Sequence, residues 1–245
     1  MIRVLQDPPL DGPSNMARDE ALMLRVGRSE SPPTLRLYQW DAPTISLGYF
    51  QRYADYESLA PPAGQLAVVR RLTGGGAILH DLELTYSLTL PVKHRLLSGG
   101  PNRLYELAHD AVMASLDSLG LTATRCGVTD DSTPARGPFF CFDRRHCYDV
   151  LIGPGKIAGS AQRRTRKAML QHGSIILGNR YTQQTTATPP HPFEKSVQHI
   201  RSALVEHLAD VTGHLIQVRN WSATEAAAAA KLIPKYAGEA WTKRA

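Results

Sequence analysis

The chain has few cysteines and no long apolar run. It carries three cysteines, Cys126, Cys141 and Cys147, in 245 residues, and an odd number in a chain too large to need staples argues against a disulfide framework. We therefore expect free thiols. No window approaches the roughly 18 uninterrupted apolar residues of a membrane-spanning helix, and the N-terminus lacks the basic-then-apolar pattern of a secretory signal. We expect a soluble, cytoplasmic protein that binds no membrane.

Internal repeats and long blocks of one charge are also missing. With 42% apolar and 20% charged residues, the chain can bury a substantial core, and its length lies at the upper end of ordinary single-domain sizes. We predict one catalytic-size domain over residues 1–245. The net charge of +6 favours acidic proteins or polyanions as partners and says nothing about the fold.

Hydrophobic periodicity predicts a mixture of helices and strands. Apolar residues recur at helical spacing over Asn15–Val26 and over Asn102–Leu119. Strand-like stretches at Thr34–Trp40 and Thr44–Phe50, separated by a proline turn, predict a hairpin. Further strands are expected over 2–5, 67–69, 84–90, 121–126, 147–152, 156–162 and 169–177, and further helices over 194–212 and 223–232. This order predicts an α+β fold with a mixed or antiparallel sheet and packed helices.

The segment Arg70–Gly76 is a candidate binding loop, since it reads Arg-Arg-Leu-Thr-Gly-Gly-Gly. Successive glycines cost backbone entropy on ordering, and they are favoured where peptide N–H groups approach a ligand closely or turn through positive φ. Expected strands flank the loop, so it sits on a scaffold. A plain tight turn is the alternative, but the two adjacent cations indicate a site for an acidic or acylated group.

The segment Lys156–Gln162 follows a tight turn at Gly153–Gly155. Its small residues leave room for an acyl chain or for the backbone of a partner. A lysine at this position can polarise a carbonyl or, when desolvated, accept a proton, whereas an exposed turn lysine is the alternative. The basic patch Arg163–Lys167 lacks the interleaved aromatics of a nucleic-acid site, so it is either solvated or meets an acidic protein.

Four segments, in this order and spacing, resemble the biotinyl/lipoyl protein ligase and transferase catalytic domain: Ser46–Gln51, Arg70–Asp81, Lys156–Gln162 and Gln171–Ser174. The resemblance covers most of the chain, and the motifs are specific in combination although each alone is weak. It implies the fold of class II aminoacyl-tRNA synthetases and biotin ligases.

Within that family, Cys141-Phe142-Asp143 ahead of Lys156 resembles the cysteine-dependent octanoyltransferase branch. This implies that octanoyl passes from octanoyl-acyl carrier protein through a Cys141 thioester to the lysine of a lipoyl domain or a glycine cleavage H protein, in lipoate biosynthesis. One thioester replaces another of similar energy before the stable amide forms, so no ATP or other cofactor is expected.

Three other activities stay open. ATP-dependent lipoate ligases resemble this chain, but they typically carry an extra C-terminal domain for which the chain ends too early. An amidotransferase between lipoyl-domain proteins would use the same chemistry with another donor. A catalytically inactive member would act as a carrier-binding or nucleic-acid-binding regulator, although we expect no nucleic-acid partner.

The resemblance implies roles for individual residues. Cys141 is the expected nucleophile and Lys156 the electrophile or base, and the expected substrate contacts are Arg70, Gly74, Gly75, Gly76, His80, Gly159 and His172. By residue type alone, Cys141 is also explained as a small buried thiol and His172 as a core histidine. Arg144, Arg145 or Lys156 can stabilise a thiolate, whereas an apolar pocket opposes it.

One geometric condition follows from the turn before Lys156. A simple hairpin centred on Pro154 would hold Cys141 far from Lys156, so residues 139–146 must fold back over the site. We expect no metal, because Cys141, His146, Cys147 and Asp149 match no zinc spacing.

Overall fold

An eight-stranded sheet forms the centre of the protein, in the order β11-β1-β2-β6-β10-β9-β8-β7. The structure is a computed structural model that describes residues 1–127, 137–213 and 216–244. β1 pairs in parallel with both of its neighbours, whereas the other pairs are antiparallel. The strands of this sheet are β1 (Ile2–Gln6), β2 (Thr34–Tyr38), β6 (Glu83–Pro91), β7 (Thr124–Arg125), β8 (Val150–Ile152), β9 (Gly155–Arg164), β10 (Ala168–Ile176) and β11 (Ile216–Val218).

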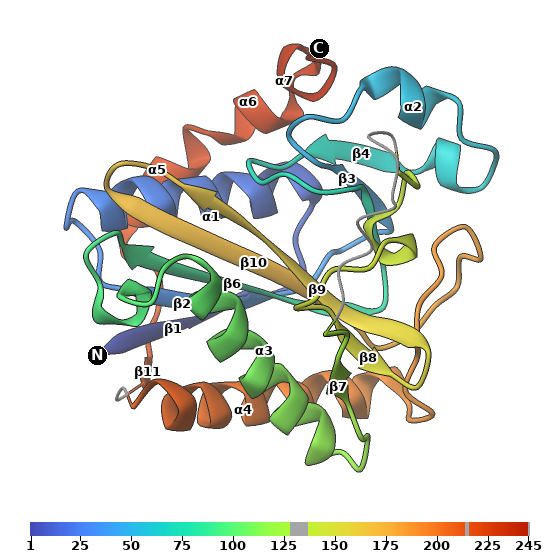
Figure 1. Ribbon diagram of the computed structural model, residues 1–245. Coiled ribbons are helices and arrows are strands. Elements are labelled where there is room, and N and C mark those ends of the chain that lie inside the picture. The colour runs from blue at the N-terminus through green and yellow to red at the C-terminus, as the bar shows by residue number, and fades with distance from the viewer. Residues whose placement is uncertain (128–136, 214–215, 245) are drawn as a thin grey trace.

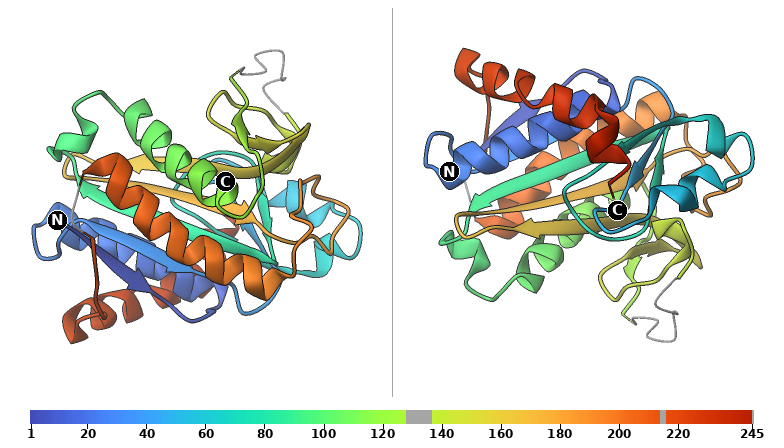
Figure 2. Two further views of the ribbon diagram at one scale, coloured as in Figure 1. Left: turned by 90° about the horizontal axis from the view of Figure 1, so that it is seen from below. Right: turned by 90° about the horizontal axis from the view of Figure 1, so that it is seen from above.

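Helices cover both faces of this sheet (Figures 1 and 2). On one face, α3 (Asn102–Asp117) and α4 (Phe193–Thr212) pack against each other and bury a large apolar core with β1, β2 and β6. The other face carries α1 (Gly12–Gly27) with the shorter α5 (Ala223–Ala230) and α6 (Ile233–Ala237). The chain therefore has the expected α+β class, with its sheet between two helical layers.

Local signals explain how the first helix starts. The side chain of Asp11 accepts a hydrogen bond from the Ser14 N–H at 2.7 Å, and a proline occupies the first turn. Both features favour a helix N-terminus at this point, because they satisfy or remove backbone donors that lack intrahelical partners. The helix consequently begins before the predicted residue 15.

A smaller three-stranded sheet carries the glycine loop. It consists of β4 (Ala67–Arg70), β3 (Thr44–Leu47) and β5 (Ile78–His80), in the order β4-β3-β5, with β3 parallel to β4 and antiparallel to β5. The loop joins β4 to β5 and is therefore anchored at both ends. Two short helices, α2 (Tyr53–Glu57) and α7 (Glu239–Thr242), lie near this sheet (Figure 1).

The predicted hairpin of residues 34–40 and 44–50 is wrong. β2 pairs with β1 and β6 in the large sheet, whereas β3 belongs to the small sheet. Trp40 is buried, and its Nε1 donates to Thr85 Oγ1 at 3.0 Å. Because Trp40 packs against β6, the residues before Pro43 stay paired with β6 and do not form a hairpin with β3. A tertiary contact thus overrides the local turn signal. In the part of the chain that the structure describes, no helix is long and apolar enough to cross a membrane.

Candidate active site

Cys141 and Lys156 lie side by side. Cys141 opens a short 3₁₀ turn, Cys141–Asp143, in a segment that is bonded to the end of the glycine loop. The Cys141 N–H donates to the Ala77 carbonyl at 2.7 Å, and the Ala77 N–H donates to the Phe139 carbonyl at 2.9 Å. Lys156 Nζ lies 3.7 Å from Cys141 Sγ and donates to the Cys141 carbonyl at 3.2 Å. The predicted fold-back of residues 139–146 is confirmed.

A buried carboxylate holds the Lys156 ammonium in place. Asp149 Oδ2 lies 2.8 Å from Lys156 Nζ, and it also accepts the His146 N–H at 2.8 Å. Both side chains of the ion pair are buried. A cation fixed beside a thiol can stabilise negative charge on the sulfur or on a reacting carbonyl oxygen. Sequence reasoning weighed Asp149 only as a metal ligand and missed this pairing across the β8–β9 hairpin.

Gly159 makes space for this ion pair. A Cβ atom at residue 159 would lie 2.7 Å from Lys156 Cε and 3.2 Å from Asp149 Oδ1. Real Cβ atoms do not approach that closely, so any side chain here would push the lysine away. The structure thus places Gly159 against the predicted catalytic lysine, whereas the sequence argument expected it to leave room for substrate.

The glycine loop and the Cys141–Lys156 pair line one outer hollow, whose wall includes Gly74, Gly75, Gly76, Cys141, Arg144 and Lys156. Gly75 has φ +91, in the left-handed region that favours glycine. A Cβ at Gly76 would lie 2.9 Å from the Cys141 backbone nitrogen. Among the described residues, no acceptor bonds the N–H groups of these three glycines. They are free to meet an acyl oxygen, as donors in oxyanion holes do.

Arg70 and Arg71, which precede the glycines of the loop, bond to different parts of the protein. Arg70 is buried and donates to backbone carbonyls, including those of Gly48, Gln51 and Thr242. Its side chain does not line the outer hollow, so its position does not support the predicted substrate contact. Arg71 instead donates to the Gly74 and Gly76 carbonyls, each at 2.7 Å, and fixes the loop. Burial lowers the pKa of Arg71 to about 10.

A second, inner hollow adjoins the outer one at Ala161, which lines both. Its wall combines apolar side chains, among them Met16, Trp40 and Ile78, with the predicted residues His80 and His172. The mainly apolar lining is of the kind that binds alkyl chains, but the free volume of about 20 Å³ holds little more than one water molecule, so the hollow must widen to admit a chain.

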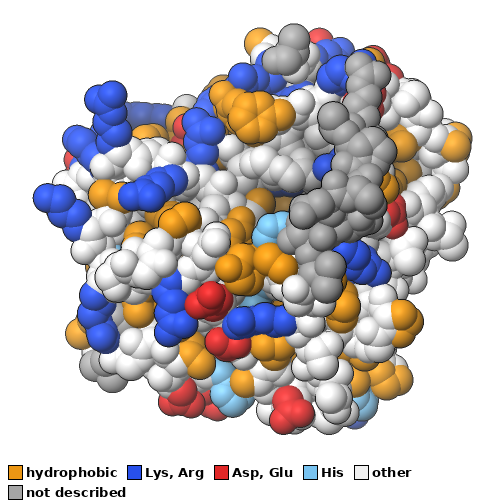
Figure 3. All heavy atoms as spheres, in the orientation of Figure 1, with side chains coloured by type: hydrophobic (Ala, Val, Ile, Leu, Met, Phe, Trp, Pro, Cys, Tyr) orange, Lys and Arg blue, Asp and Glu red, His pale blue; other side chains and the backbone are white. Residues whose placement is uncertain are grey.

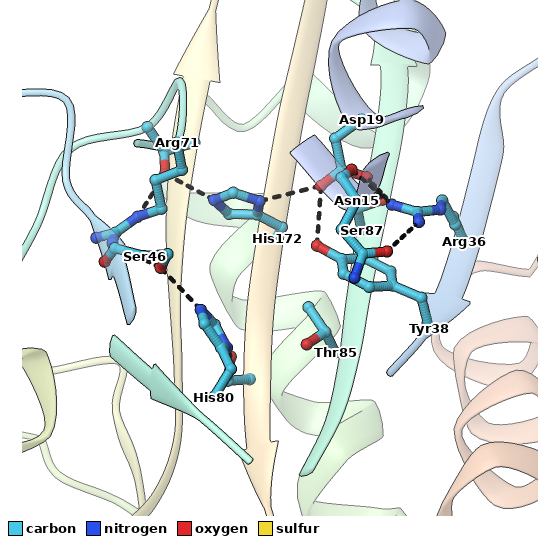
Figure 4. A network of polar contacts seen from close by, with 12 residues as sticks. Asn15, Asp19, Arg36, Tyr38, Ser46, Arg71, His80, Thr85, Ser87 and His172 are labelled. Atoms are coloured by element: carbon cyan, nitrogen blue, oxygen red, sulfur yellow. Dashed lines mark hydrogen bonds and ion pairs between the residues drawn. The ribbon is translucent and has the colours of Figure 1, made fainter. Parts of the chain in front are cut away.

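A buried polar network holds the two histidines (Figure 4). His172 lies between Thr73 Oγ1, 2.6 Å from its Nε2, and Asp19 Oδ2, 3.2 Å from its Nδ1. The Nε2 atom of His80 is 2.7 Å from Ser46 Oγ, and its Nδ1 atom is 2.9 Å from Glu83 Oε1.

The same network extends beyond the hollow. Asp19 of α1, the partner of His172, also forms an ion pair with Arg36 of β2 at 2.8 Å. The position of His172 is therefore linked to both elements. The ring of His80 stacks on Trp40 with 3.8 Å between centroids, and burial lowers its pKa. Because every ring nitrogen has a partner, the orientations of the two histidine rings are fixed before any ligand enters.

Comparison with known proteins is consistent with this geometry. Residues 11–230 match the lipoyl protein ligase A/B catalytic domain. The chain belongs to this family. It is 34% identical to octanoyltransferase LipM of Kyrpidia tusciae over 94% of each chain, and 42% identical to octanoyltransferase LipM of Symbiobacterium thermophilum over 71% of this chain and 65% of that protein. These similarities confirm the octanoyltransferase branch that the Cys141 motif indicated.

The fold is shared with a solved T. acidophilum protein described as a lipoate protein ligase. The two superpose with a TM-score of 0.77 at 24% identity, over 98% of each chain. Within residues 1–127, 137–213 and 216–244, no three His, Cys, Asp or Glu side chains gather as metal ligands would. The candidate site consists of the Cys141 thiol, the Lys156–Asp149 ion pair, the glycine loop and the two hollows.

Proposed function

We propose that this protein is an octanoyltransferase that moves an octanoyl group from acyl carrier protein, through a thioester on Cys141, to the lysine of a lipoyl-domain protein. The observation that carries the proposal is the placement of the Cys141 thiol 3.7 Å from the Lys156 ammonium, in a hollow shared with the glycine loop. The relatives named octanoyltransferase support the same activity.

In the first step, the Cys141 sulfur attacks the thioester carbonyl of the donor. The Cys141 thiol gives up its proton, a new carbon–sulfur bond forms, the bond to the carrier's phosphopantetheine sulfur breaks, and that sulfur leaves as a thiolate that takes up the proton released by Cys141. The free N–H groups of Gly75 and Gly76 receive the carbonyl oxygen, and the Lys156 ammonium stabilises the sulfur charge. The alkyl chain extends past Ala161 into the inner hollow, which widens to admit it.

In the second step, the amine of the acceptor lysine attacks the Cys141 thioester. A carbon–nitrogen bond forms, the carbon–sulfur bond breaks, and Cys141 takes the surplus proton of the nitrogen. Thioester exchange is close to neutral in free energy and amide formation is downhill, so the reaction as proposed uses neither ATP nor any other cofactor. A lipoyl domain or a glycine cleavage H protein is the acceptor.

Basic side chains around the outer hollow suit acidic carriers. Arg144 and Arg145 line the hollow, and Arg163 and Arg164 follow on β9. Among the described residues, none of the four forms an ion pair with a carboxylate. Figure 3 shows Lys and Arg side chains gathered over the turn end of the β9–β10 hairpin. Such charge favours an acidic protein and the phosphate of its prosthetic arm. Because a thiol nucleophile must stay reduced, we assign the protein to the cytoplasm.

The test is transfer without ATP. Purified protein, octanoyl-acyl carrier protein and a lipoyl domain are mixed without nucleotide or magnesium, and the mass of the lipoyl domain is followed. We expect octanoylation by the wild type and by Cys126→Ser, the matched control, and none by Cys141→Ser. Octanoylation by Cys141→Ser that requires ATP and free octanoate would overturn the proposal in favour of a ligase. The same assay with octanoylated H protein in place of acyl carrier protein tests whether the protein also takes octanoyl from a lipoyl-domain donor, as an amidotransferase would.

A further inference from the structure

A buried hydrogen-bond chain ends at Ser160, in the wall of the outer hollow. Ser160 lies on β9 and lines the hollow together with Cys141 and Lys156. Its Oγ bonds to Nε2 of His109, a residue of α3 that is only 1% exposed. The other ring nitrogen, Nδ1, bonds to the Tyr148 carbonyl. Neither of the two proposed reaction steps uses this series of hydrogen bonds.

Chemistry fixes the direction of each bond. A carbonyl oxygen only accepts, so the proton of the neutral His109 ring is on Nδ1, and Nε2 accepts the Ser160 hydroxyl proton. Burial lowers the pKa of His109 to about 4, which keeps the ring neutral near pH 7. Because the hydroxyl proton of Ser160 is committed, Tyr86 Oη must donate to Ser160 Oγ, at 2.6 Å. Gln171 Nε2 in turn donates to Tyr86 Oη at 3.2 Å.

Ser160 therefore offers only a lone pair to the hollow. A hydroxyl oxygen has two lone pairs, and Tyr86 occupies one. The three protons of the neighbouring Lys156 ammonium already face Asp149 Oδ2, the Cys141 carbonyl and Cys141 Sγ. Among the described residues, no further donor reaches Ser160 Oγ, so the remaining lone pair is left for a substrate donor. In the proposed second step, the incoming primary amine is the group that brings N–H donors into the hollow.

We propose that Ser160, with its hydroxyl turned inward by His109, accepts an N–H hydrogen bond from the attacking lysine amine and so directs the amine lone pair at the acyl carbon on Cys141. This role rests on the proposed function. Ser160 holds the amine but does not take its proton, because His109 resists protonation. The surplus proton passes to the departing Cys141 sulfur. Ser160 is then a residue of the aminolysis step and has no task in the loading of Cys141.

Separating the two steps tests this assignment. Each variant is loaded from octanoyl-acyl carrier protein and then chased with a lipoyl domain in a single turnover, with both masses followed over time. We expect Ser160→Ala to load Cys141 within about threefold of the wild-type rate and to transfer roughly 10- to 100-fold more slowly, since a misplaced reactant costs on this order. Ser115→Ala, a buried serine on α3 that bonds to the Ala111 carbonyl, is the matched control and leaves both rates unchanged.

A second variant protects the test against misfolding of the first. His109→Leu keeps the Ser160 hydroxyl but removes the acceptor that turns its proton inward, so transfer slows while loading continues. Equal slowing of loading and transfer, or unchanged transfer in Ser160→Ala, would overturn the role of Ser160. Failure of the wild type to load Cys141 would instead overturn the proposed function itself.

Discussion

Replacing Gly159 with alanine tests the ion pair beside Cys141. The added Cβ would lie 2.7 Å from Lys156 Cε and 3.0 Å from Lys156 Nζ, and 3.2 Å from Asp149 Oδ1. The lysine side chain is buried, so it cannot swing into solvent without breaking its 2.8 Å contact with Asp149. We expect the ammonium to move away from Cys141 Sγ.

Two magnitudes follow from this displacement. Overpacking a well-packed site costs about 1–3 kcal/mol of the free energy of unfolding, and each kcal/mol lowers the Tm of a chain of this size by about 2–4 °C. A misplacement of about 1 Å at a reacting group costs on the order of 100-fold in rate. The variant should therefore remain folded while Cys141 acylation slows by about two orders of magnitude.

Thermal unfolding and the rate of octanoyl adduct formation, followed by intact-mass spectrometry, measure both effects. Gly99→Ala is the matched control, because a Cβ there meets the Arg103 side chain at an ordinary 3.4 Å. The control should load at the wild-type rate. If Gly159→Ala also loads within twofold of wild type, the position of the Lys156 ammonium has no part in acylation and the reasoning fails.

Three further predictions concern other parts of the protein. Arg70→Met should lower the free energy of unfolding by about 3 kcal/mol, because several buried carbonyls lose a charged donor, and should change the turnover rate by less than about threefold. A large loss of turnover at unchanged Tm would instead support the predicted contact between Arg70 and substrate. The pKa of His109 in the folded protein, about 4, lies below the usual value of about 6.5. Folding therefore favours the neutral ring, which adds about 3 kcal/mol to the free energy of unfolding above pH 6.5, and this stabilisation is lost as the pH falls to 4. Unfolding curves of His109→Gln should lack this loss, and equal pH dependence in both proteins would contradict it. The KM for acyl carrier protein should rise with salt, and this rise should be smaller in Arg163→Gln/Arg164→Gln, because surface attraction is screened; a KM independent of salt would exclude electrostatic docking.

Most of the fold could be predicted because its elements carry local signals. α3 and α4 have apolar residues at helical spacing, and β10 is a continuous buried strand. The hairpin prediction failed where a distant contact, the burial of Trp40 against Thr85, decided the path of the chain. The three residues of β5 were also missed, since so short a strand is stabilised by its neighbours in the sheet and not by its own composition.

The site could be predicted only as far as its motifs reach. Cys141 and Lys156 were found through the resemblance, and the fold-back that joins them followed from the turn between them. Asp149 was missed as the partner of Lys156 because the strand register shifts between Val150 and Leu151, and hydrophobic patterning does not show which residues face each other across such a hairpin. His109 was missed as the partner of Ser160 because α3 and β9 meet only in three dimensions. The difference between Arg70 and Arg71 likewise depends on which guanidinium meets which carbonyls, and adjacent identical residues carry no signal for that.

The most direct test of the central claim is to isolate the octanoyl-enzyme and chase it. After loading and removal of acyl carrier protein, a lipoyl domain is added without ATP, and the peptide that contains Cys141 is followed by mass spectrometry. The account predicts that octanoyl leaves this peptide at the same rate at which the lipoyl domain gains it. An octanoyl group that stays on Cys141 while the lipoyl domain is modified, or that is found on another residue, would contradict it.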